Sequence, residues 1–212
     1  MAGLFDLPGA PEKITDGLVI IREGIHDPDA VLREVHRIAQ QSPWRTMITP
    51  GGKTMSVEMT NAGAVGWISD RRGYRYEGID PVTGEPWPAI HNDIVNLVRT
   101  SAMAAGYPGF EPDVCLVNRY RIGTKMSLHQ DRDEADFSHP IVSFSLGMSA
   151  TFLFGGLRRT DPTLKLPLHH GDIVVWGGSS RLHYHGIASV NGPAHSMVGP
   201  YRINLTFRRA HS

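Results

Sequence analysis

The stretch "DVCLVNRYRIGTKMSLHQD", residues 113–131, joins a strand-like segment, a turn and a His-x-Asp pair. The first eight residues favour a strand, and "RIGTK" is typical of a turn. His129 and Asp131 follow that turn on a segment expected to be extended. Because residues i and i+2 of an extended segment share a face, these two side chains can converge on one ion.

Further strand-like segments follow at intervals marked by turn residues. They are "IVSFSLG" (141–147), "ATFLFGG" (150–156), "LKLPLHH" (164–170), "DIVVWGG" (172–178), "RLHYHGI" (181–187) and "YRINLTFRR" (201–209). Seven or eight short strands without an intervening helix indicate an antiparallel sandwich or barrel, of which the jelly roll is the kind that hosts cupin-like metal sites. We therefore predict a jelly-roll core over residues 113–212.

The N-terminal half has a different texture. Residues 17–22 favour a strand, and apolar spacing predicts helices over 28–41 and 89–105. Residues 43–88 are loop-rich with short β-like pieces, and such long irregular segments are more often functional than structural. Residues 1–16 are expected to be a flexible N-terminus. The chain is thus predicted to be one α+β, mainly β domain, in which residues 17–112 form an extension of the core.

A second His-x-acid pair, His91 and Asp93, tests how specific the first one is. With 11 histidines and 21 acidic residues among 212, about one such pair is expected by chance. This pair lies in the helix predicted over 89–105, where residues i and i+2 point away from each other. We therefore expect it not to bind an ion jointly.

Composition excludes some classes of protein. The formal net charge is zero, so any binding of nucleic acid or membrane must rest on local charge. The single cysteine, Cys115, rules out an intrachain disulfide and is expected to be a buried small hydrophobe, with a catalytic or ligating thiol as the less favoured alternative. No run of about 20 apolar residues is present. These features favour a soluble, cytoplasmic protein.

A third metal ligand is offered by "HYHG", in which His183 and His185 share a strand face. Either could instead be a hydrogen-bonded histidine of the core or rim. Two histidines and one carboxylate leave coordination positions open, which suits non-haem Fe(II) that must hold a co-substrate and O₂. Structural zinc would want a closed shell, usually with cysteine.

The last predicted strand carries polar residues on one face. They are Arg202, Asn204, Thr206 and Arg208. Two arginines facing the inside of a barrel are costly unless they meet anions, and 2-oxoglutarate has a carboxylate at each end. The alternative is an edge strand with solvated arginines. Asn118 and Tyr120 share a face of the first strand and could donate to the same ligand.

These motifs together resemble one known family. "NRY", "SLHQDRDE", "SFSLG", "FLFGG", "HYHGI" and "RINLTFR" are similar to motifs of the AlkB family of Fe(II)- and 2-oxoglutarate-dependent dioxygenases, which repair alkylated DNA and RNA. The resemblance is to the bacterial type, runs from about residue 17 to the end and includes "TPGGKTMSVEMTNAG". It implies a double-stranded β-helix core and a nucleotide-recognition lid over about residues 43–88.

The resemblance also implies roles for single residues. The iron ligands would be His129, Asp131 and His185, which leaves His183 as a neighbour. The 2-oxoglutarate cradle would be Arg202, Arg208, Asn118, Tyr120 and Asn204. The substrate contacts would be Trp67 stacking on the damaged base, Tyr74 and Tyr76 on the adjoining nucleotide lid, and Asp133 and Arg159 as polar contacts to the base. Local positive charge for phosphates would come from Arg71, Arg72, Arg75, Lys125, Arg158 and Arg159.

The implied activity is oxidative demethylation of bases such as 1-methyladenine and 3-methylcytosine, releasing formaldehyde, succinate and CO₂. Alkylated single-stranded DNA is the expected partner, with double-stranded DNA and RNA as further candidates, no membrane and a monomeric chain. One alternative is the same chemistry on RNA, a protein or a small molecule. Another is a non-catalytic 2-oxoglutarate sensor or nucleic-acid-binding module.

Overall fold

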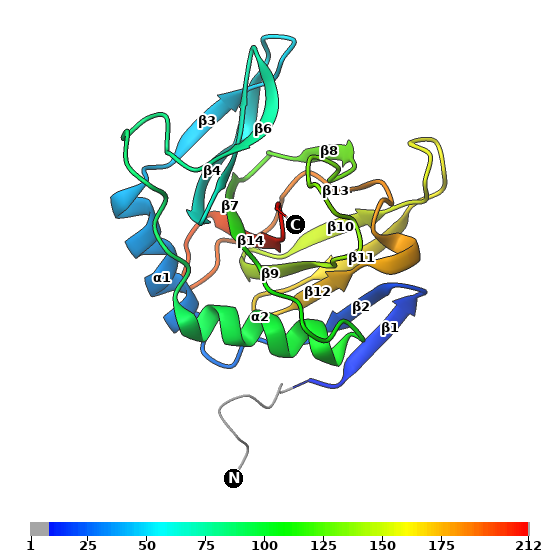
Figure 1. Cartoon of the computed structure of the whole chain (residues 1–212). Helices are drawn as coiled ribbons and strands as arrows, with labels where there is room; N and C mark the ends of the chain where they lie inside the picture. Colours follow the sequence, from blue (N-terminus) through cyan, green and yellow to red (C-terminus); the bar gives the residue numbers. More distant parts are fainter. Residues whose placement is uncertain (1–8, 212) are drawn as a thin grey trace.

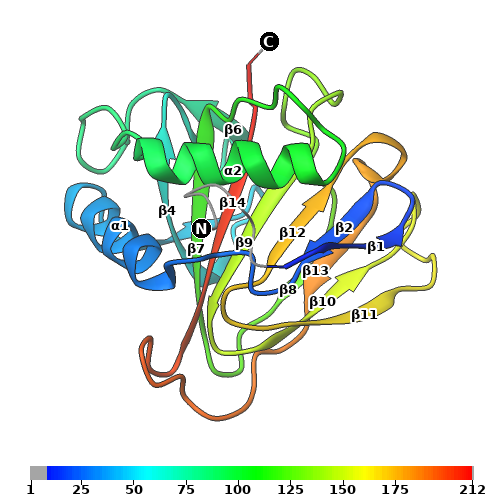
Figure 2. The same cartoon turned by 90° about the horizontal axis from the view of Figure 1, so that it is seen from below.

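The computed structural model describes residues 9–211. Residues 1–8 of the predicted N-terminal segment 1–16 therefore lie outside the described residues. Two β-sheets face each other, and two helices cover the outer face of the larger sheet (Figure 1; Figure 2). The predicted mainly β fold with a jelly-roll core is confirmed.

The larger sheet has eight antiparallel strands in the order β1-β2-β12-β9-β14-β7-β4-β3. Their bounds are Pro11–Thr15 (β1), Leu18–Ile21 (β2), Ile173–Trp176 (β12), Ile141–Gly147 (β9), Tyr201–Arg208 (β14), Val114–Arg121 (β7), Thr54–Gly63 (β4) and Arg45–Ile48 (β3). β14 thus lies between β9 and β7. The edge-strand alternative for this segment is wrong.

The smaller sheet has four antiparallel strands in the order β11-β10-β13-β8. They span Leu164–Leu168 (β11), Ala150–Phe154 (β10), His185–Ile187 (β13) and Met126–His129 (β8), and a short 3-10 helix, η1, spans Gly178–Ser180. A separate hairpin joins Gly66–Asp70 (β5) to Gly73–Glu77 (β6). Together with β3 and β4, this hairpin extends beyond the core at the top of Figure 1.

Each helix has a recognisable boundary signal, at the start of α1 and after the end of α2. Helix α1 (Pro28–Gln41) begins after Asp27, whose side chain accepts a hydrogen bond from Ala30 N at 2.8 Å, and it has Pro28 in its first turn. Helix α2 (Asn92–Ala104) is followed by Gly106 at φ +93°, a conformation that glycine adopts without strain. The apolar faces of both helices pack on the larger sheet in one core cluster.

Strand β14 shows how the sequence divides the core. Ile203, Leu205 and Phe207 belong to the cluster beneath the helices. The alternating residues Arg202, Asn204, Thr206 and Arg208 are also buried, but they line a pocket between the two sheets. A second apolar cluster, which includes Phe152 and Trp176, fills the remaining space between the sheets. The polar face of β14 therefore points inward, as its alternation predicted.

Two expectations about the N-terminal half need correction. Residues 11–15 are not flexible, because they form β1 and pair with β2. Residues 43–88 contain four strands, and β4 alone has ten residues and pairs with β7. The glycines, prolines and charges of this segment hid the extent of these strands. β4 is stabilised by pairing with the distant β7, whereas β3 pairs with β4, and β5 pairs with β6.

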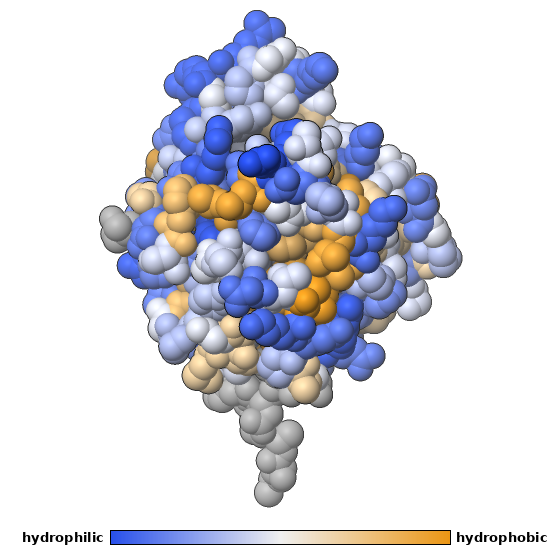
Figure 3. Space-filling model, turned by 90° about the vertical axis from the view of Figure 1, so that its right-hand side faces the viewer, coloured by the Kyte–Doolittle hydropathy of each residue, from blue (hydrophilic) through white to orange (hydrophobic). Residues whose placement is uncertain are grey.

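One face of the molecule is shown in Figure 3, on the side where β8, β10, β11 and β13 lie in Figure 1. Hydrophobic residues gather in the middle of this face and hydrophilic residues surround them. Over residues 9–211, no helix has the length and apolar character needed to cross a membrane.

Candidate active site

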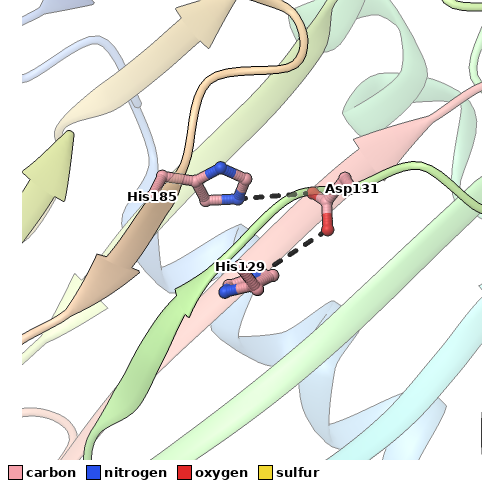
Figure 4. Close-up of side chains that lie close together, drawn as sticks. All are labelled: His129, Asp131 and His185. Atoms are coloured by element: carbon pink, nitrogen blue, oxygen red, sulfur yellow. Dashed lines mark ion pairs between the residues drawn. The ribbon is translucent and has the colours of Figure 1, made fainter. Parts of the chain in front are cut away.

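The pairing of β8 with β13 brings two histidines together. His129 and His185 are register partners, and their ring centroids are 4.5 Å apart. Asp131 follows β8 by two residues. Its Oδ1 lies 3.7 Å from His129 Nε2, and its Oδ2 lies 3.5 Å from His185 Nε2 (Figure 4). The three predicted ligands therefore offer donor atoms within 4.8 Å of one another.

Backbone carbonyls orient both imidazole rings. His129 Nδ1 lies 2.9 Å from Ser127 O, and His185 Nδ1 lies 3.0 Å from His183 O. Because a carbonyl oxygen can only accept, each Nδ1 carries the proton, and each Nε2 keeps its lone pair facing Asp131. This is the arrangement in which histidine binds a metal ion through Nε2.

The charge states also suit a cation. Burial, together with the neighbouring His185, lowers the pKa of His129 to about 4, so His129 is neutral at pH 7. Burial raises the pKa of Asp131, but Arg208 and the two histidines outweigh this and hold the pKa well below its usual range. The site therefore presents neutral imidazole and an ionised carboxylate.

The other histidines considered as ligands are not part of this metal-ligand group. The His183 ring packs on Phe154 at 5.4 Å between centroids, and His183 is not part of the metal-ligand group. His91 is the N-cap of α2 rather than a residue inside it, and its Nδ1 lies 3.5 Å from Asp93 Oδ2. The predicted divergence of His91 and Asp93 is thus wrong. Within residues 9–211, however, no third ligand joins them.

A pocket of about 620 Å³ opens beside the triad. Arg202 lines it and is 1 % exposed, with Nη2 donating to Ser145 Oγ at 3.2 Å. Its Nε and Nη1 have no hydrogen-bond partner among residues 9–211. A buried guanidinium with unused donors is costly, and a carboxylate would remove that cost.

The other predicted cradle residues surround the same pocket. Asn118 and Tyr120 line it, and Asn118 Oδ1 has no hydrogen-bond partner in the described chain. Arg208 Nη2 lies 2.7 Å from Asp131 Oδ2. The amide of Asn204 donates to Ser143 Oγ at 2.7 Å and to Phe144 O at 2.9 Å, so its two N–H groups are already in use. The pocket therefore fits Fe(II) at the triad and a dicarboxylate toward Arg202.

Comparison with known proteins agrees with this geometry. The family model described as 2OG-Fe(II) oxygenase superfamily matches residues 17–208. The chain is 53 % identical over 200 residues to the alpha-ketoglutarate-dependent dioxygenase AlkB of Salmonella typhimurium, covering 94 % of this chain and 93 % of that protein. The AlkB protein of Escherichia coli is 52 % identical over the same shares. The chain belongs to the AlkB family of Fe(II)- and 2-oxoglutarate-dependent dioxygenases.

More distant AlkB proteins also match. The AlkB homolog of Caulobacter vibrioides is 46 % identical over 86 % of this chain and 82 % of its own length. A solved structure described as "The structure of OsALKBH1" has a TM-score of 0.83 at 28 % identity, and it covers 94 % of this chain and 99 % of that one. The double-stranded β-helix core of the AlkB family is therefore present here.

The AlkB pocket has an aromatic side as well. Trp67 and Tyr74 line it and stack with ring centroids 5.5 Å apart and an interplanar angle of 14°. Trp67 Nε1 donates to Asp133 Oδ2 at 2.8 Å. Arg159 also lines the pocket, with its guanidinium carbon 5.3 Å from the Tyr184 ring centroid. Four predicted substrate residues thus line the same pocket as the triad.

Tyr76 lies elsewhere. Its hydroxyl donates to Glu134 Oε1 at 2.6 Å, and Tyr76 does not line the pocket. The assignment of Tyr76 as a nucleotide contact stays a prediction. The sequence had assigned no role to Glu134 or Arg181, which are 6 % and 3 % exposed. A buried carboxylate cannot be told from a solvated one in a charged run such as "DRDE".

The basic residues divide into paired and available ones. Arg75 pairs with Asp70 and Glu77, and Arg72 pairs with Asp70. These two arginines are therefore partly neutralised within the hairpin. Lys53 and Lys125 line the pocket together with Arg159, so the positive charge at the pocket comes mainly from residues outside the hairpin.

Proposed function

We propose that this AlkB-family chain repairs DNA by removing methyl groups from the Watson–Crick edge of bases such as 1-methyladenine and 3-methylcytosine. Alkylated single-stranded DNA is its preferred substrate, and double-stranded DNA and RNA are further substrates. One observation carries the proposal: the His129, Asp131 and His185 triad, the unpaired donors of Arg202 and the Trp67 ring all face one pocket.

Each part of the pocket has a task in this reaction. Fe(II), 2-oxoglutarate and O₂ supply the oxidation of the N-methyl carbon, with succinate and CO₂ as products. The triad holds the ion, and Arg202 binds a carboxylate of 2-oxoglutarate. Trp67 stacks on the target base, an interaction worth about 1–3 kcal/mol that does not depend on sequence. The hydroxymethyl group that results leaves the base as formaldehyde.

Access to the methyl group explains the single-strand preference. A methyl group on the Watson–Crick edge is hidden inside a duplex, so the base must be flipped or already unpaired. The carboxylate of Asp133, at the Trp67 edge, favours a cationic methylated base over a neutral one by charge complementarity. Lys53, Lys125 and Arg159 supply positive charge for phosphates at the pocket.

The proposal also assigns a role to each half of the chain and a compartment to the protein. Residues 17–112 serve as the recognition extension, with the nucleotide lid over about 43–88, and residues 113–212 hold the iron and co-substrate. The acting form is a monomer in the cytoplasm. The support for that compartment is the single cysteine, which is typical of proteins in reducing surroundings.

Mass spectrometry of a short single-stranded DNA with one 3-methylcytosine tests the proposal. The protein is incubated with Fe(II), 2-oxoglutarate and air, and a control lacks 2-oxoglutarate. We expect loss of the methyl group only in the complete reaction. An unchanged oligonucleotide with succinate formed would move the search to an RNA, protein or small-molecule substrate. If 2-oxoglutarate bound but no succinate formed, the chain would be a sensor and not an enzyme.

A further inference from the structure

Asp133 and Glu134 follow the ligand Asp131 in the chain, and each accepts a hydrogen bond from a residue of the β5–β6 hairpin. Trp67 on β5 and Tyr76 on β6 are register partners, so they share one face of the hairpin. Trp67 Nε1 donates to Asp133 Oδ2 at 2.8 Å, and Tyr76 OH donates to Glu134 Oε1 at 2.6 Å. Two hydrogen bonds therefore connect this face of the hairpin to the segment that begins with Asp131.

These two hydrogen bonds differ in their access to water. Asp133 is exposed, so a base stacked on Trp67 can compete for its carboxylate. The side chain of Glu134 is 1 % exposed. Burial raises the pKa of Tyr76, Arg208 lowers it, and Glu134 raises it again, so the Tyr76 hydroxyl stays protonated as a donor. The Tyr76 to Glu134 hydrogen bond is thus shielded from water, whereas the Trp67 to Asp133 hydrogen bond is not.

Glu134 also reaches the co-substrate end of the pocket. Arg208 Nη2 lies 2.7 Å from Asp131 Oδ2, Arg208 Nε lies 3.6 Å from Glu134 Oε1, and Arg208 Nη1 donates to Tyr76 OH at 3.4 Å. Glu134 Oε2 accepts from Arg181 Nη2 at 3.1 Å. Two acids and two guanidiniums thus balance one another in a buried cluster, where loss of one member leaves an uncompensated charge.

Arg181 fixes the loop that carries these acids. Its Nη1 donates to the backbone oxygen of Asp131 at 2.7 Å, and its Nε donates to His139 O at 3.0 Å. These hydrogen bonds hold the backbone on both sides of Glu134, which lies between Tyr76 and Arg208.

We propose that Tyr76 and Glu134 are positioning residues that link the base-stacking hairpin to Arg208 and Asp131, so that binding at the co-substrate end stiffens the hairpin. The link is reciprocal, because two sites coupled in equilibrium change each other's affinity by the same factor. This inference rests on the assignment of the pocket to Fe(II) and 2-oxoglutarate. It does not depend on which nucleic acid is the substrate.

Hydrogen–deuterium exchange of residues 66–77 tests the link, with Mn(II) used as a metal that does not start turnover. In the unmodified chain, Mn(II) plus 2-oxoglutarate should slow exchange of the hairpin. Tyr76→Phe removes one hydroxyl and should abolish that slowing. It should also weaken 2-oxoglutarate binding, measured by calorimetry, by roughly fivefold or more.

Two variants serve as matched controls. Tyr107→Phe removes a hydroxyl whose partner, Gly17 O, lies outside the pocket, at 3.5 Å. Trp67→Phe removes the other hydrogen bond made by the same hairpin face, the one from Trp67 Nε1 to Asp133. Both should retain the slowing by 2-oxoglutarate. If Tyr76→Phe keeps the slowing, or if Tyr107→Phe loses it equally, the proposed link is wrong.

A further variant covers a failure of Tyr76→Phe to fold. Glu134→Gln keeps an oxygen that can accept from Tyr76 but removes the charge facing Arg208 and Arg181. It should therefore lower 2-oxoglutarate affinity as well, and retained affinity would overturn the proposal. No nucleic acid is used in these measurements, so their outcome is separate from that of the demethylation assay.

Discussion

His129 and His185 stand directly opposite each other on β8 and β13, with their ring centroids 4.5 Å apart. They are 56 positions apart in the sequence, so the metal site exists only once the smaller sheet has formed. The carbonyls that accept from their Nδ1 atoms belong to Ser127 and His183, two residues before each ligand. Strand β8 and the residues that lead into β13 thus aim both Nε2 atoms at Asp131.

The metal-ligand assignment predicts opposite results for two histidines two residues apart. His185→Gln removes a ligand and should weaken Mn(II) or Fe(II) binding by at least about 100-fold, since even loss of an outer contact costs 10–100-fold. His183→Gln should leave metal affinity within about threefold of the unmodified chain, because its ring packs on Phe154. Calorimetric titration with Mn(II) measures both. Equal losses in the two variants would refute the assignment.

Arg202 should matter for ligand binding more than for folding. Arg202→Met replaces a buried guanidinium that has two unused donors, so we expect the melting temperature without ligand to stay equal or rise. In the unmodified chain with Mn(II), 2-oxoglutarate at 100 times its Kd should add about 2.7 kcal/mol of stability. The variant should show no such gain.

Thermal unfolding with and without 2-oxoglutarate checks this expectation. Arg99→Met is the matched control, because Arg99 is half exposed and pairs with Glu111 away from the pocket. That control should keep the full gain from 2-oxoglutarate. A gain that survives in Arg202→Met would show that the carboxylate is bound by another residue.

Much of the core was predictable from local pattern. The alternation of β14 placed Arg202 and Arg208 on the face opposite Leu205, and this is where they lie. The spacing of His129 and Asp131 on an extended segment was enough to predict that they converge. In both places, period-two geometry fixes the side of the strand on which a side chain lies.

Other features depended on contacts that no local pattern contains. Glu134 stands in a charged run, and it is buried only because Arg181, Arg208 and Tyr76 come to it from three distant segments. The assignment of Tyr76 as a nucleotide contact came from resemblance alone and stays a prediction, and no local pattern indicated its hydrogen bond to Glu134. His91 was placed inside a helix because apolar spacing does not mark the N-cap to within a residue.

The proposed stacking of a base on Trp67 predicts a separation between base binding and co-substrate use. Trp67→Ala should raise the KM for a methylated oligonucleotide by roughly 5- to 150-fold, the equivalent of about 1–3 kcal/mol of stacking. Some succinate should still form without demethylation, because the triad and Arg202 are untouched. Trp67→Phe keeps a ring and should recover most of the affinity. Unchanged repair kinetics in Trp67→Ala would show that the base stacks elsewhere.

Asp80, which lies within residues 43–88, predicts a pH dependence of stability. Asp80 is fully buried, and its carboxylate accepts from Arg45 and from Ser42 Oγ, the latter at 2.7 Å. Burial raises the pKa of Asp80, but these hydrogen bonds outweigh it and bring the pKa to about 2. Because the folded-state pKa is depressed, the stabilisation is complete above the unfolded pKa of about 3.9 and is lost as pH falls through about 2.

Asp80→Asn should therefore lower the free energy of unfolding by about 3 kcal/mol at pH 7, the usual cost of removing one member of a buried ion pair. The difference from the unmodified chain should shrink between about pH 4 and pH 2, because protonation neutralises Asp80 there. Urea unfolding at several pH values measures it. Glu85→Gln, at an exposed carboxylate, should show no comparable difference at any of these pH values. If the difference in free energy of unfolding between Asp80→Asn and the unmodified chain stayed constant from pH 7 to pH 2, the charge of Asp80 would contribute nothing. Its hydrogen bonds alone would then stabilise this part of residues 43–88.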